Sequence, residues 1–302
     1  MDRGSLRIVR WIAVAALAAA AAPFAPAAET LPPWMFHYPV DGELAFTHDD
    51  NVNRGRDSEL RIGDDVASLT FRQPRDQDLG RNVRLEITPI AALDVFRRHS
   101  GLDRVSGGVE ALLEYRASGA FDATTWALVG RAAYDEYDSG LRDGARYFIG
   151  VSAERALTDR IQAYLEAGRN ETDASSDVFN GHDYAAKLSL VYSIGDKDVA
   201  YLTGQYRKGD TVSTGGPSLV NAELARVLVP DDAFDSQLIA YRFKARTVFS
   251  LLGWNHALGP RAAIDLSWRR VDSAPDDRPG IDFPGRLRYI ANQYSLVYLR
   301  RF

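Results

Sequence analysis

The segment that decides the fold is Tyr294-Ser295-Leu296-Val297-Tyr298-Leu299-Arg300-Arg301-Phe302, at the end of the chain. Successive side chains of a β-strand point to opposite faces. One face therefore carries Tyr294, Leu296, Tyr298 and Phe302, and Arg300 is its only departure. A strand in this place leaves no edge in lipid only if it pairs on both sides within a closed sheet. The segment predicts a membrane-spanning β-barrel in which it is the closing strand.

This ending resembles the last strand of bacterial outer-membrane β-barrels. The resemblance implies that Tyr294, Leu296, Tyr298 and Phe302 form an assembly signal. It also implies three partners: the barrel assembly machinery, outer-membrane lipid and lipopolysaccharide. Arg300 fits this picture, because an arginine at the membrane rim extends its charge to the head groups.

The beginning of the chain has the pattern of a secretory signal peptide. Arg3, Arg7 and Arg10 precede an apolar run over Trp11–Ala22, and Ala25-Pro26-Ala27 offers a cleavage site. The run is shorter than the roughly 20 apolar residues that a membrane anchor needs. We therefore expect a signal peptide at 1–28, a short periplasmic segment at 29–41, an outer-membrane barrel at 42–302, and an outer-membrane location.

Composition narrows the class of protein. The 302 residues include no cysteine, which excludes disulfides and a lipid-anchored amino terminus. Mean hydropathy is −0.25 and no later segment is continuously apolar, so a helical membrane protein is excluded. The net charge of −5 gives no basic footprint for nucleic acid.

Alternating hydrophobicity predicts twelve strands. They are expected at 42–49, 65–73, 82–97, 105–117, 124–137, 145–156, 160–170, 182–194, 198–209, 238–256, 261–271 and 288–302. Tight turns near 157–160, 194–197 and 258–261 alternate with long polar connections. Short periplasmic turns and long outer loops are typical of outer-membrane barrels, so both termini are expected on the periplasmic side.

Each strand has one apolar face and one polar face. Aromatic residues gather near strand ends on the apolar face, as they do in the interfacial girdles of such barrels. These residues are Trp126, Tyr134, Tyr184, Tyr192, Trp254, Trp268, Tyr294 and Phe302. We therefore expect an all-β, antiparallel, up-and-down transmembrane barrel with its apolar face in lipid.

The polar face should then line the lumen. We expect a basic ladder of Arg207, Arg242, Lys244, Arg246 and Arg269, together with acidic residues Glu86, Asp94, Glu110, Glu114, Glu166 and Asp265. One interpretation is a hydrated, salt-bridged interior that keeps the barrel from collapsing. The other is a pore in which the ladder attracts anions.

The long connections are acidic and include Asp49, Asp64, Asp183 and Asp231. Solvation explains such residues, and the alternative is that they share divalent cations with lipopolysaccharide. In the loop at 210–237, the segment 221–228 has a cap-like start and helical periodicity. A short helix there either plugs the mouth or decorates the surface.

The segment His48-Asp49-Asp50-Asn51 is the best constellation for catalysis. It resembles the early Asn/Asp cluster of lipid A deacylases, which keeps a lipid-modifying enzyme among the alternatives. No serine is arranged as a nucleophile. The sequence therefore predicts no catalytic residue, no cofactor and no metal site.

The longer segment Phe46–Arg54, with Asp49, Asp50 and Asn51 at its centre, also resembles the opening strand of two kinds of barrel. These are the C-terminal barrels of surface lipoprotein assembly modifiers and the barrels of exopolysaccharide operons. The resemblance implies export or uptake of a polar polymer. Three functions thus remain open: a passive porin-like channel for small or polymeric polar solutes, a structural or surface-interaction barrel with a filled lumen, and a lipid-modifying enzyme.

Overall fold

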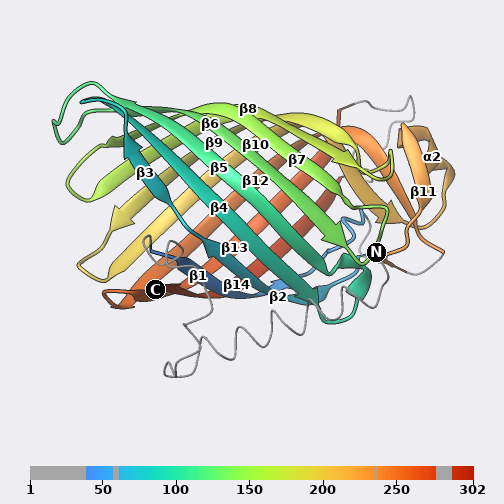
Figure 1. Ribbon diagram of the computed structural model, residues 1–302. Coiled ribbons are helices and arrows are strands. Elements are labelled where there is room, and N and C mark those ends of the chain that lie inside the picture. The colour runs from blue at the N-terminus through green and yellow to red at the C-terminus, as the bar shows by residue number, and fades with distance from the viewer. Residues whose placement is uncertain (1–38, 57–60, 235–236, 277–287) are drawn as a thin grey trace, which may run out of the picture.

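The structure, a computed structural model, describes residues 39–56, 61–234, 237–276 and 288–302. It contains one fourteen-stranded antiparallel sheet that closes on itself (Figure 1). The strands are β1 (Asp41–Asp49), β2 (Asp64–Arg72), β3 (Arg75–Asp78), β4 (Val83–Phe96), β5 (Arg104–Arg116), β6 (Thr125–Tyr137), β7 (Gly144–Ala156), β8 (Ile161–Ala174), β9 (Gly181–Ser193), β10 (Asp198–Gly215), β11 (Val227–Pro230), β12 (Ile239–Gly259), β13 (Ala262–Pro275) and β14 (Tyr289–Arg301). Without the short additions β3 and β11, twelve strands form the ring.

Two pairings close the barrel. Strand β14 pairs with β1, from Asp41 opposite Arg301 to Asp49 opposite Gln293. On the far side β10 pairs directly with β12, because β11 lies outside the ring. The predicted twelve-stranded antiparallel barrel and its closing strand are confirmed, and several strands run further than expected at one end.

The two short strands were not predicted. Strand β3 continues along β4 where β2 stops, and the break between them falls at Pro74. Proline has no N–H for the ladder, so it interrupts a strand at this point. Gln73 keeps the connection in place, since its N–H donates to the Pro89 carbonyl at 3.1 Å. Strand β11 pairs with the start of β12.

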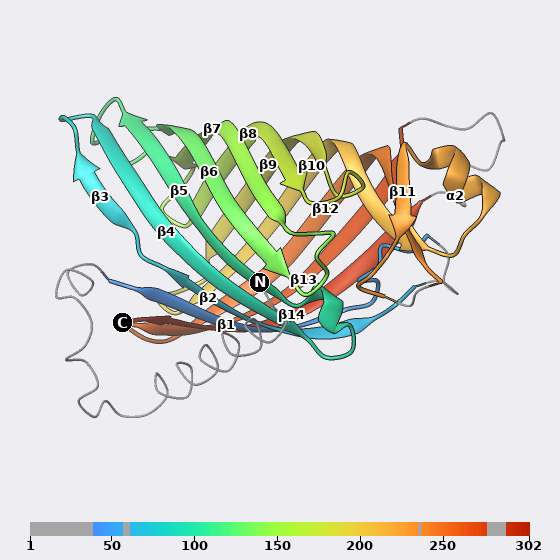
Figure 2. The same cartoon turned by 45° about the vertical axis from the view of Figure 1, so that its right-hand side comes forward.

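The barrel has a turn end and a loop end. The turn end carries tight connections such as 157–160, 194–197 and 260–261, and the loop end carries the longest ones, after β1, β10 and β13. Beyond the loop end lie β11 and the six-residue helix α2 (Leu219–Leu224), as Figure 2 shows. None of the helices in the described ranges is long and apolar enough to cross a membrane. The signal peptide and all but the last residues of segment 29–41 lie outside the described residues.

In the half of the barrel nearer the turn end, the wall is apolar outside and polar inside. Leu128 in β6, Val151 in β7 and Leu202 in β10 are more than half exposed on the outer face. The predicted girdle aromatics Trp126, Tyr192, Trp254 and Phe302 are exposed there too, and Tyr134, Tyr184 and Tyr294 are exposed on the same outer face closer to the loop end. This outer band has the composition that lipid requires.

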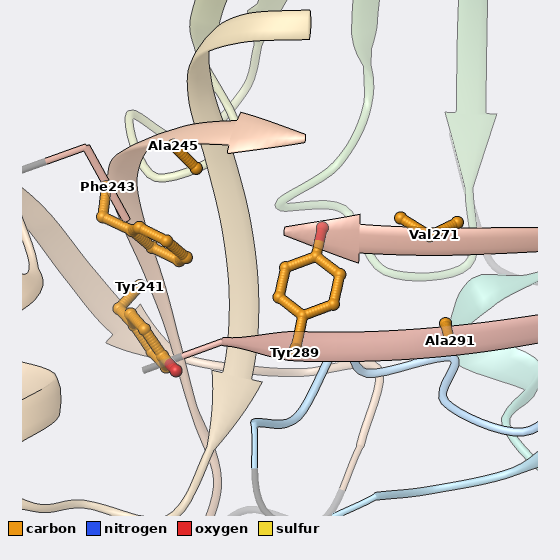
Figure 3. Close-up of a cluster of buried hydrophobic side chains, with 6 residues drawn as sticks. All are labelled: Tyr241, Phe243, Ala245, Val271, Tyr289 and Ala291. Carbon is orange, nitrogen blue, oxygen red and sulfur yellow. The ribbon is translucent and has the colours of Figure 1, made fainter. Parts of the chain in front are cut away.

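Near the loop end the polarity of the wall is reversed along β12, β13 and β14. Inward side chains of β12, β13 and β14 form a buried cluster, which consists of Tyr241, Phe243, Ala245, Val271, Tyr289 and Ala291 (Figure 3). The outward neighbours at this level are charged, such as Lys208 in β10 and Arg246 in β12. We call the six buried residues of the cluster in Figure 3 the loop-end core. Here the wall resembles that of a water-soluble protein, with apolar groups inside and charges outside.

Candidate functional site: the charged lumen and its mouth

The lumen holds most of the charges predicted for it. Arg207 and Arg269 of the basic ladder line one inner cavity. The acidic side chains Glu86, Asp94, Glu110, Glu114, Glu166 and Asp265 lie on inward positions of their strands, between outward apolar residues. Each of them has a polar partner. Asp265, for example, accepts a hydrogen bond of 2.8 Å from the Tyr201 hydroxyl.

The prediction that Arg242, Lys244 and Arg246 line the lumen is wrong. Strand β12 pairs with β10 without a bulge from Ile239 to His256, so these residues share the outward face with Leu252. Arg246 is 59% exposed and pairs with Asp276, and the Lys244 ammonium lies 3.0 Å from Asp210. The reason is the reversal of polarity: near the loop end, the charged face of β12 is its outer face.

In the middle of the barrel an arginine joins three strands. Arg131 of β6 donates to Glu110 of β5 and to Glu166 of β8. Its guanidinium lies 4.7 Å from the ring centroid of Phe148. That ring rests directly on Gly168, where a Cβ atom would come within 2.6 Å of it. Arg131 is thereby held at a fixed place on the lumen wall.

Closer to the loop end, two arginines share a carboxylate. Arg104 of β5 lies 2.6 Å from Asp94 and 3.6 Å from Asp135. Arg146 of β7 donates to the same Asp135 at 2.9 Å. Asp94 is one of the predicted lumen acids, whereas Arg104 was not predicted, because the expected strand began one residue later. Alternation continued by one residue would have found it.

A third group of arginines, Arg207 and Arg269, lies on another part of the lumen wall, and Arg207 lines the same cavity as Arg104, Arg131 and Arg146. Arg207 of β10 donates through Nε to Asp183 at 2.9 Å, and Arg269 of β13 lies over the ring of Phe249 at 4.8 Å. The acidic loops were expected to include Asp183, which instead faces the lumen in β9. No carboxylate of the described residues lies within ion-pair distance of Arg269. The spacing of residues in the sequence gives no sign of this difference between the two arginines.

These groups surround a chain of cavities. The middle cavity has a volume of about 670 Å³ and is lined by five arginines, namely Arg72, Arg104, Arg131, Arg146 and Arg207. Glu110 is the one inward carboxylate among the described residues that line it. Nearer the loop end, a cavity of about 390 Å³ shares Arg104 and Arg146 with it, and one of about 250 Å³ shares Arg207. Arginine side chains therefore line each junction between the cavities.

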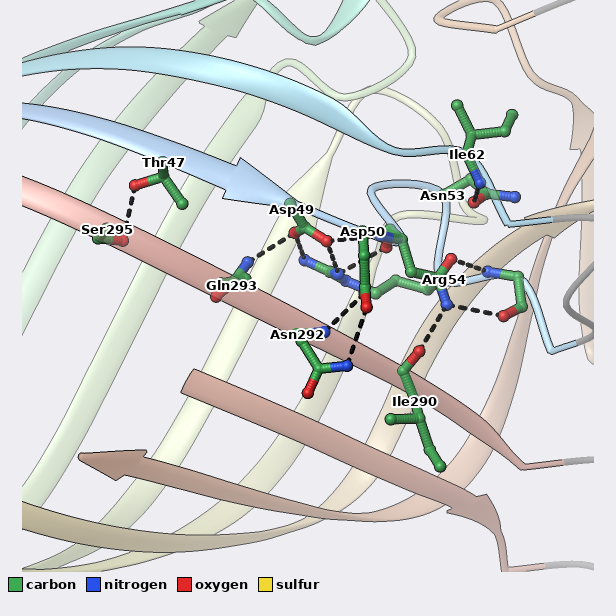
Figure 4. Close-up of polar contacts among 12 residues, drawn as sticks. Thr47, Asp49, Asp50, Asn53, Arg54, Ile62, Ile290, Asn292, Gln293 and Ser295 are labelled. Atoms are coloured by element: carbon green, nitrogen blue, oxygen red, sulfur yellow. Dashed lines mark hydrogen bonds and ion pairs between the residues drawn. The ribbon is translucent and has the colours of Figure 1, made fainter. Parts of the chain in front are cut away.

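A turn that follows β1 lies across the mouth at the loop end (Figure 4). The buried Asn51 side chain donates to Gly55 O and Ile290 O at 2.8 and 2.9 Å. Asn53 donates to Thr214 O at 2.9 Å, and Thr214 N–H donates back to Asn53 O at 2.8 Å. The turn is thus tied to both β14 and β10. Arg54 adopts a positive φ of 56°, a conformation that the surrounding hydrogen bonds stabilise.

Arg54 forms the charged centre of this turn. Its guanidinium donates to both carboxylate oxygens of Asp49, at 3.1 and 2.8 Å. Gln293 donates to the same carboxylate at 2.6 Å. Burial by itself would raise the pKa of Asp49, and the adjacent Arg54 guanidinium outweighs it and holds that pKa below its usual range. Asp49, Asp50 and Asn51, the motif of the first strand, therefore hold the mouth together, and Asp50 accepts from Asn292 at 2.8 Å.

The other connections of the loop end interlock through a second arginine. Arg142, which is 10% exposed, donates to the fully buried Asp231 at 2.7 Å. Asp231 also accepts from the Thr214 hydroxyl. The Arg142 guanidinium carbon lies 4.3 Å from the ring centroid of Phe179 and 5.9 Å from that of Phe234. We call Arg142 and Asp231 the mouth latch, because they connect the loops after β6, β8 and β10.

The predicted helix at 221–228 is only partly correct. Helix α2 starts earlier, with Ser218 as its cap, because the Ser218 side chain accepts from Asn221 N–H at 3.1 Å. Residues from Val227 onward form β11. The helix lies beyond the rim in Figure 2, whereas Asp231 and Ala233 of the same loop are buried.

The acidic residues of the connections are largely held by protein groups. Asp64, which was expected to be solvated, accepts from the ring and the N–H of His99 at 2.8 and 3.0 Å. The described residues include no group of three acidic or histidine side chains arranged for a metal ion. His48 lies beside Asp65, at 2.8 Å. A divalent-cation role for the acidic loops stays a prediction.

The closing strand lies as its alternation indicates. Tyr294 and Leu296 are exposed on the outer face, and Tyr298 lies on the same face. Phe302 N–H donates to Val40 O at 2.9 Å, and Arg300 lies 5.5 Å from the Phe302 ring. The role of these residues as an assembly signal stays a prediction.

Comparison with known proteins identifies the fold. No family model matches the chain, and no curated protein matches it in sequence. An outer-membrane channel from Pseudomonas putida F1 is similar in structure, with a TM-score of 0.56 and 13% identity over 93% of this chain and 100% of the other. The NanC porin gives a TM-score of 0.47 at 9% identity, over 86% of this chain and 100% of the porin. The KdgM porin gives a TM-score of 0.41 at 9% identity, over 86% and 99%. The protein is therefore an all-antiparallel β-barrel with the fold of bacterial outer-membrane proteins.

Proposed function

We propose that the protein is a passive outer-membrane channel for small anionic solutes. The observation that carries this proposal is the middle cavity of about 670 Å³, which five inward arginines line together with one inward carboxylate. Guanidinium groups in a lumen attract anions and lower the barrier to their passage. The likeness to the Pseudomonas channel supports the fold on which the proposal rests.

The proposed orientation follows the usual arrangement of such barrels. The turn end, where β1 begins and β14 finishes, faces the periplasm, and the loop end faces the exterior. The outward charges near the loop end, such as Lys208 and Arg246, then meet the lipopolysaccharide head groups. Signal-peptide export and the barrel assembly machinery would deliver the chain to this place.

Planar-bilayer recording tests the proposal. The purified barrel should give stepwise conductance, and its reversal potential in a salt gradient should indicate a preference for anions. Replacing two lumen arginines, as in Arg72→Gln with Arg146→Gln, should shift the reversal potential toward cations. Arg246→Gln is the matched control, because Arg246 faces outward. A cation preference in the unaltered protein would contradict the proposal.

A structural barrel with a closed mouth is the second candidate, and the mouth latch favours it. The buried pair Arg142–Asp231 ties several connections together over the lumen. Under this alternative the bilayer shows no conductance above that of lipid alone. The third candidate, a lipid-modifying enzyme, predicts loss of acyl chains from lipid A when the protein is overexpressed. The likeness to the Pseudomonas outer-membrane channel supports the first candidate.

A further inference from the structure

The cavity of about 250 Å³ near the loop end concentrates positive charge in a way the rest of the lumen does not. Arg54, Arg207 and Arg269 line it, from the turn after β1, from β10 and from β13. Arg54 and Arg207 each hold a carboxylate, those of Asp49 and Asp183. Asp210, which also lines the cavity, is paired with Lys244 at 3.0 Å. Arg269 has no ion-pair partner among the described residues; Arg54 and Arg207 repel its charge, and Asp49, beyond ion-pair distance, attracts it. The cavity therefore has one positive charge in excess.

Aromatic stacking holds that excess charge in place. The guanidinium carbon of Arg269 lies 4.8 Å from the ring centroid of Phe249, and that of Arg207 lies 5.8 Å from the same ring. A partly buried cation without a counter-ion is costly in free energy. An anion bound between these arginines would offset the cost. Planar guanidinium groups match the two oxygens of a carboxylate, which gives such an anion a defined orientation.

The remaining walls indicate what else the anion carries. Thr211, Thr247, Tyr289 and Gln293 contribute hydroxyl and amide groups to the cavity. Phe249 and Val271 contribute an apolar side. Ligand sites commonly combine apolar walls with a few polar groups that fix orientation. A hydroxylated ring or chain offers both kinds of surface, whereas a simple inorganic anion offers neither an apolar face nor several hydroxyl groups.

We propose that Arg54, Arg207 and Arg269 form a binding subsite for the carboxylate of a small hydroxylated acid, of the sugar-acid class. Arg269 provides the charge that no protein carboxylate satisfies, and Arg54 and Arg207 orient the bound group. The subsite rests on the proposed function in one respect, since it names the class of solute that the channel would conduct. The volume of about 250 Å³ suits one such unit at a time.

Calorimetry on the detergent-folded barrel at low ionic strength tests the subsite, with glucuronate, glucose and inorganic phosphate as probes. Glucuronate should bind more tightly than both others. Arg269→Gln should weaken glucuronate binding by about tenfold or more, since a charge-assisted contact is lost. Arg269→Lys should weaken it less, because the charge stays. Arg246→Gln should leave binding unchanged, and mobility shifts on heating confirm that each variant is folded.

Three results would overturn the subsite: equal binding of glucuronate and glucose, binding of phosphate as tight as that of glucuronate, or no effect of Arg269→Gln. Calorimetry needs no flow through the barrel, so the two proposals fail separately. A barrel that binds glucuronate through Arg269 and does not conduct supports the subsite and contradicts the channel. A conducting barrel in which Arg269→Gln leaves binding unchanged supports the channel and contradicts the subsite.

Discussion

The two halves of strand β12 use the same alternation in opposite ways. Toward the turn end, Leu252 and Trp254 are exposed on the outer face, and the inward residue between them is the small Gly253. Toward the loop end, the outer face carries Arg246 and the inner face carries the buried Phe243. The register with β10 is continuous from Ile239 to His256. Alternation therefore specifies the two faces of a strand, whereas the surroundings at each height along the barrel, lipid or water, decide which face must be apolar.

This difference also explains what the loop end does. Its inner face is apolar where the loop-end core packs, and polar where the turn after β1 and the mouth latch close the barrel. The middle of the barrel contributes a lumen lined by arginines. The barrel wall that faces lipid thus continues into a loop end that is packed like a water-soluble protein. Substitutions in the two parts should therefore have different effects.

The largest effect is expected for the loop-end core. Phe243 is 3% exposed, so Phe243→Ala should lower the free energy of unfolding by about 3–5 kcal/mol through a cavity. Denaturant unfolding of the folded barrel measures it. Val248→Ala, which removes an exposed side chain from the outer face of the same strand, is the control and should change little. Equal effects of the two substitutions would remove the distinction between the halves.

A charge placed in the lipid-facing half should have the next largest effect. Leu252→Arg should destabilise the barrel in lipid vesicles by about 2–4 kcal/mol, as an arginine near mid-membrane does. The reciprocal change, Arg246→Leu, lies six residues away on the same face and removes only a surface ion pair, worth about 1 kcal/mol or less. Equilibrium folding into vesicles compares the two. Similar costs for both would show that the outer face is uniform.

Opening the mouth latch should affect the loop end alone. Arg142→Ala leaves the buried Asp231 without its cation, which costs about 1–3 kcal/mol unless the loop moves and hydrates it. We expect faster proteolysis of the loop-end connections and a higher single-channel conductance. Adding Asp231→Asn should recover part of the stability, because the unpaired charge is gone. An unchanged conductance in a variant with loosened loops would show that the latch does not limit flow.

The smallest effect concerns pH and Asp49. Its folded pKa lies below the usual value of about 3.9. The ion pair with Arg54 therefore stabilises the mouth fully above that value, and the contribution is lost as the pH falls through the lowered pKa. Hydrogen exchange of residues 50–56 should increase below about pH 4. Asp49→Asn should abolish this pH dependence, and its persistence in that variant would assign the effect to another group.

Much of the barrel could be predicted from residues alone. The alternation around Leu188, Leu266 and Tyr298 identified outward faces correctly, because lipid imposes the same apolar requirement on every strand that crosses it. The inward acids such as Glu110 and Glu166 followed from the same pattern. The ladder of Arg242, Lys244 and Arg246 did not, because no local pattern records the height of a residue relative to the membrane.

The sequence by itself determined the twelve strands of the ring, their order and the direction of most side chains, since a period of two and the demand for closure are local properties repeated along the chain. Only the tertiary structure decided which charges meet. Arg142 and Asp231 are 89 residues apart, and Arg54 meets Arg207 and Arg269 only because three distant segments converge on one cavity. Such encounters depend on the curvature of the closed wall and on loops folding back over it, which no single strand encodes.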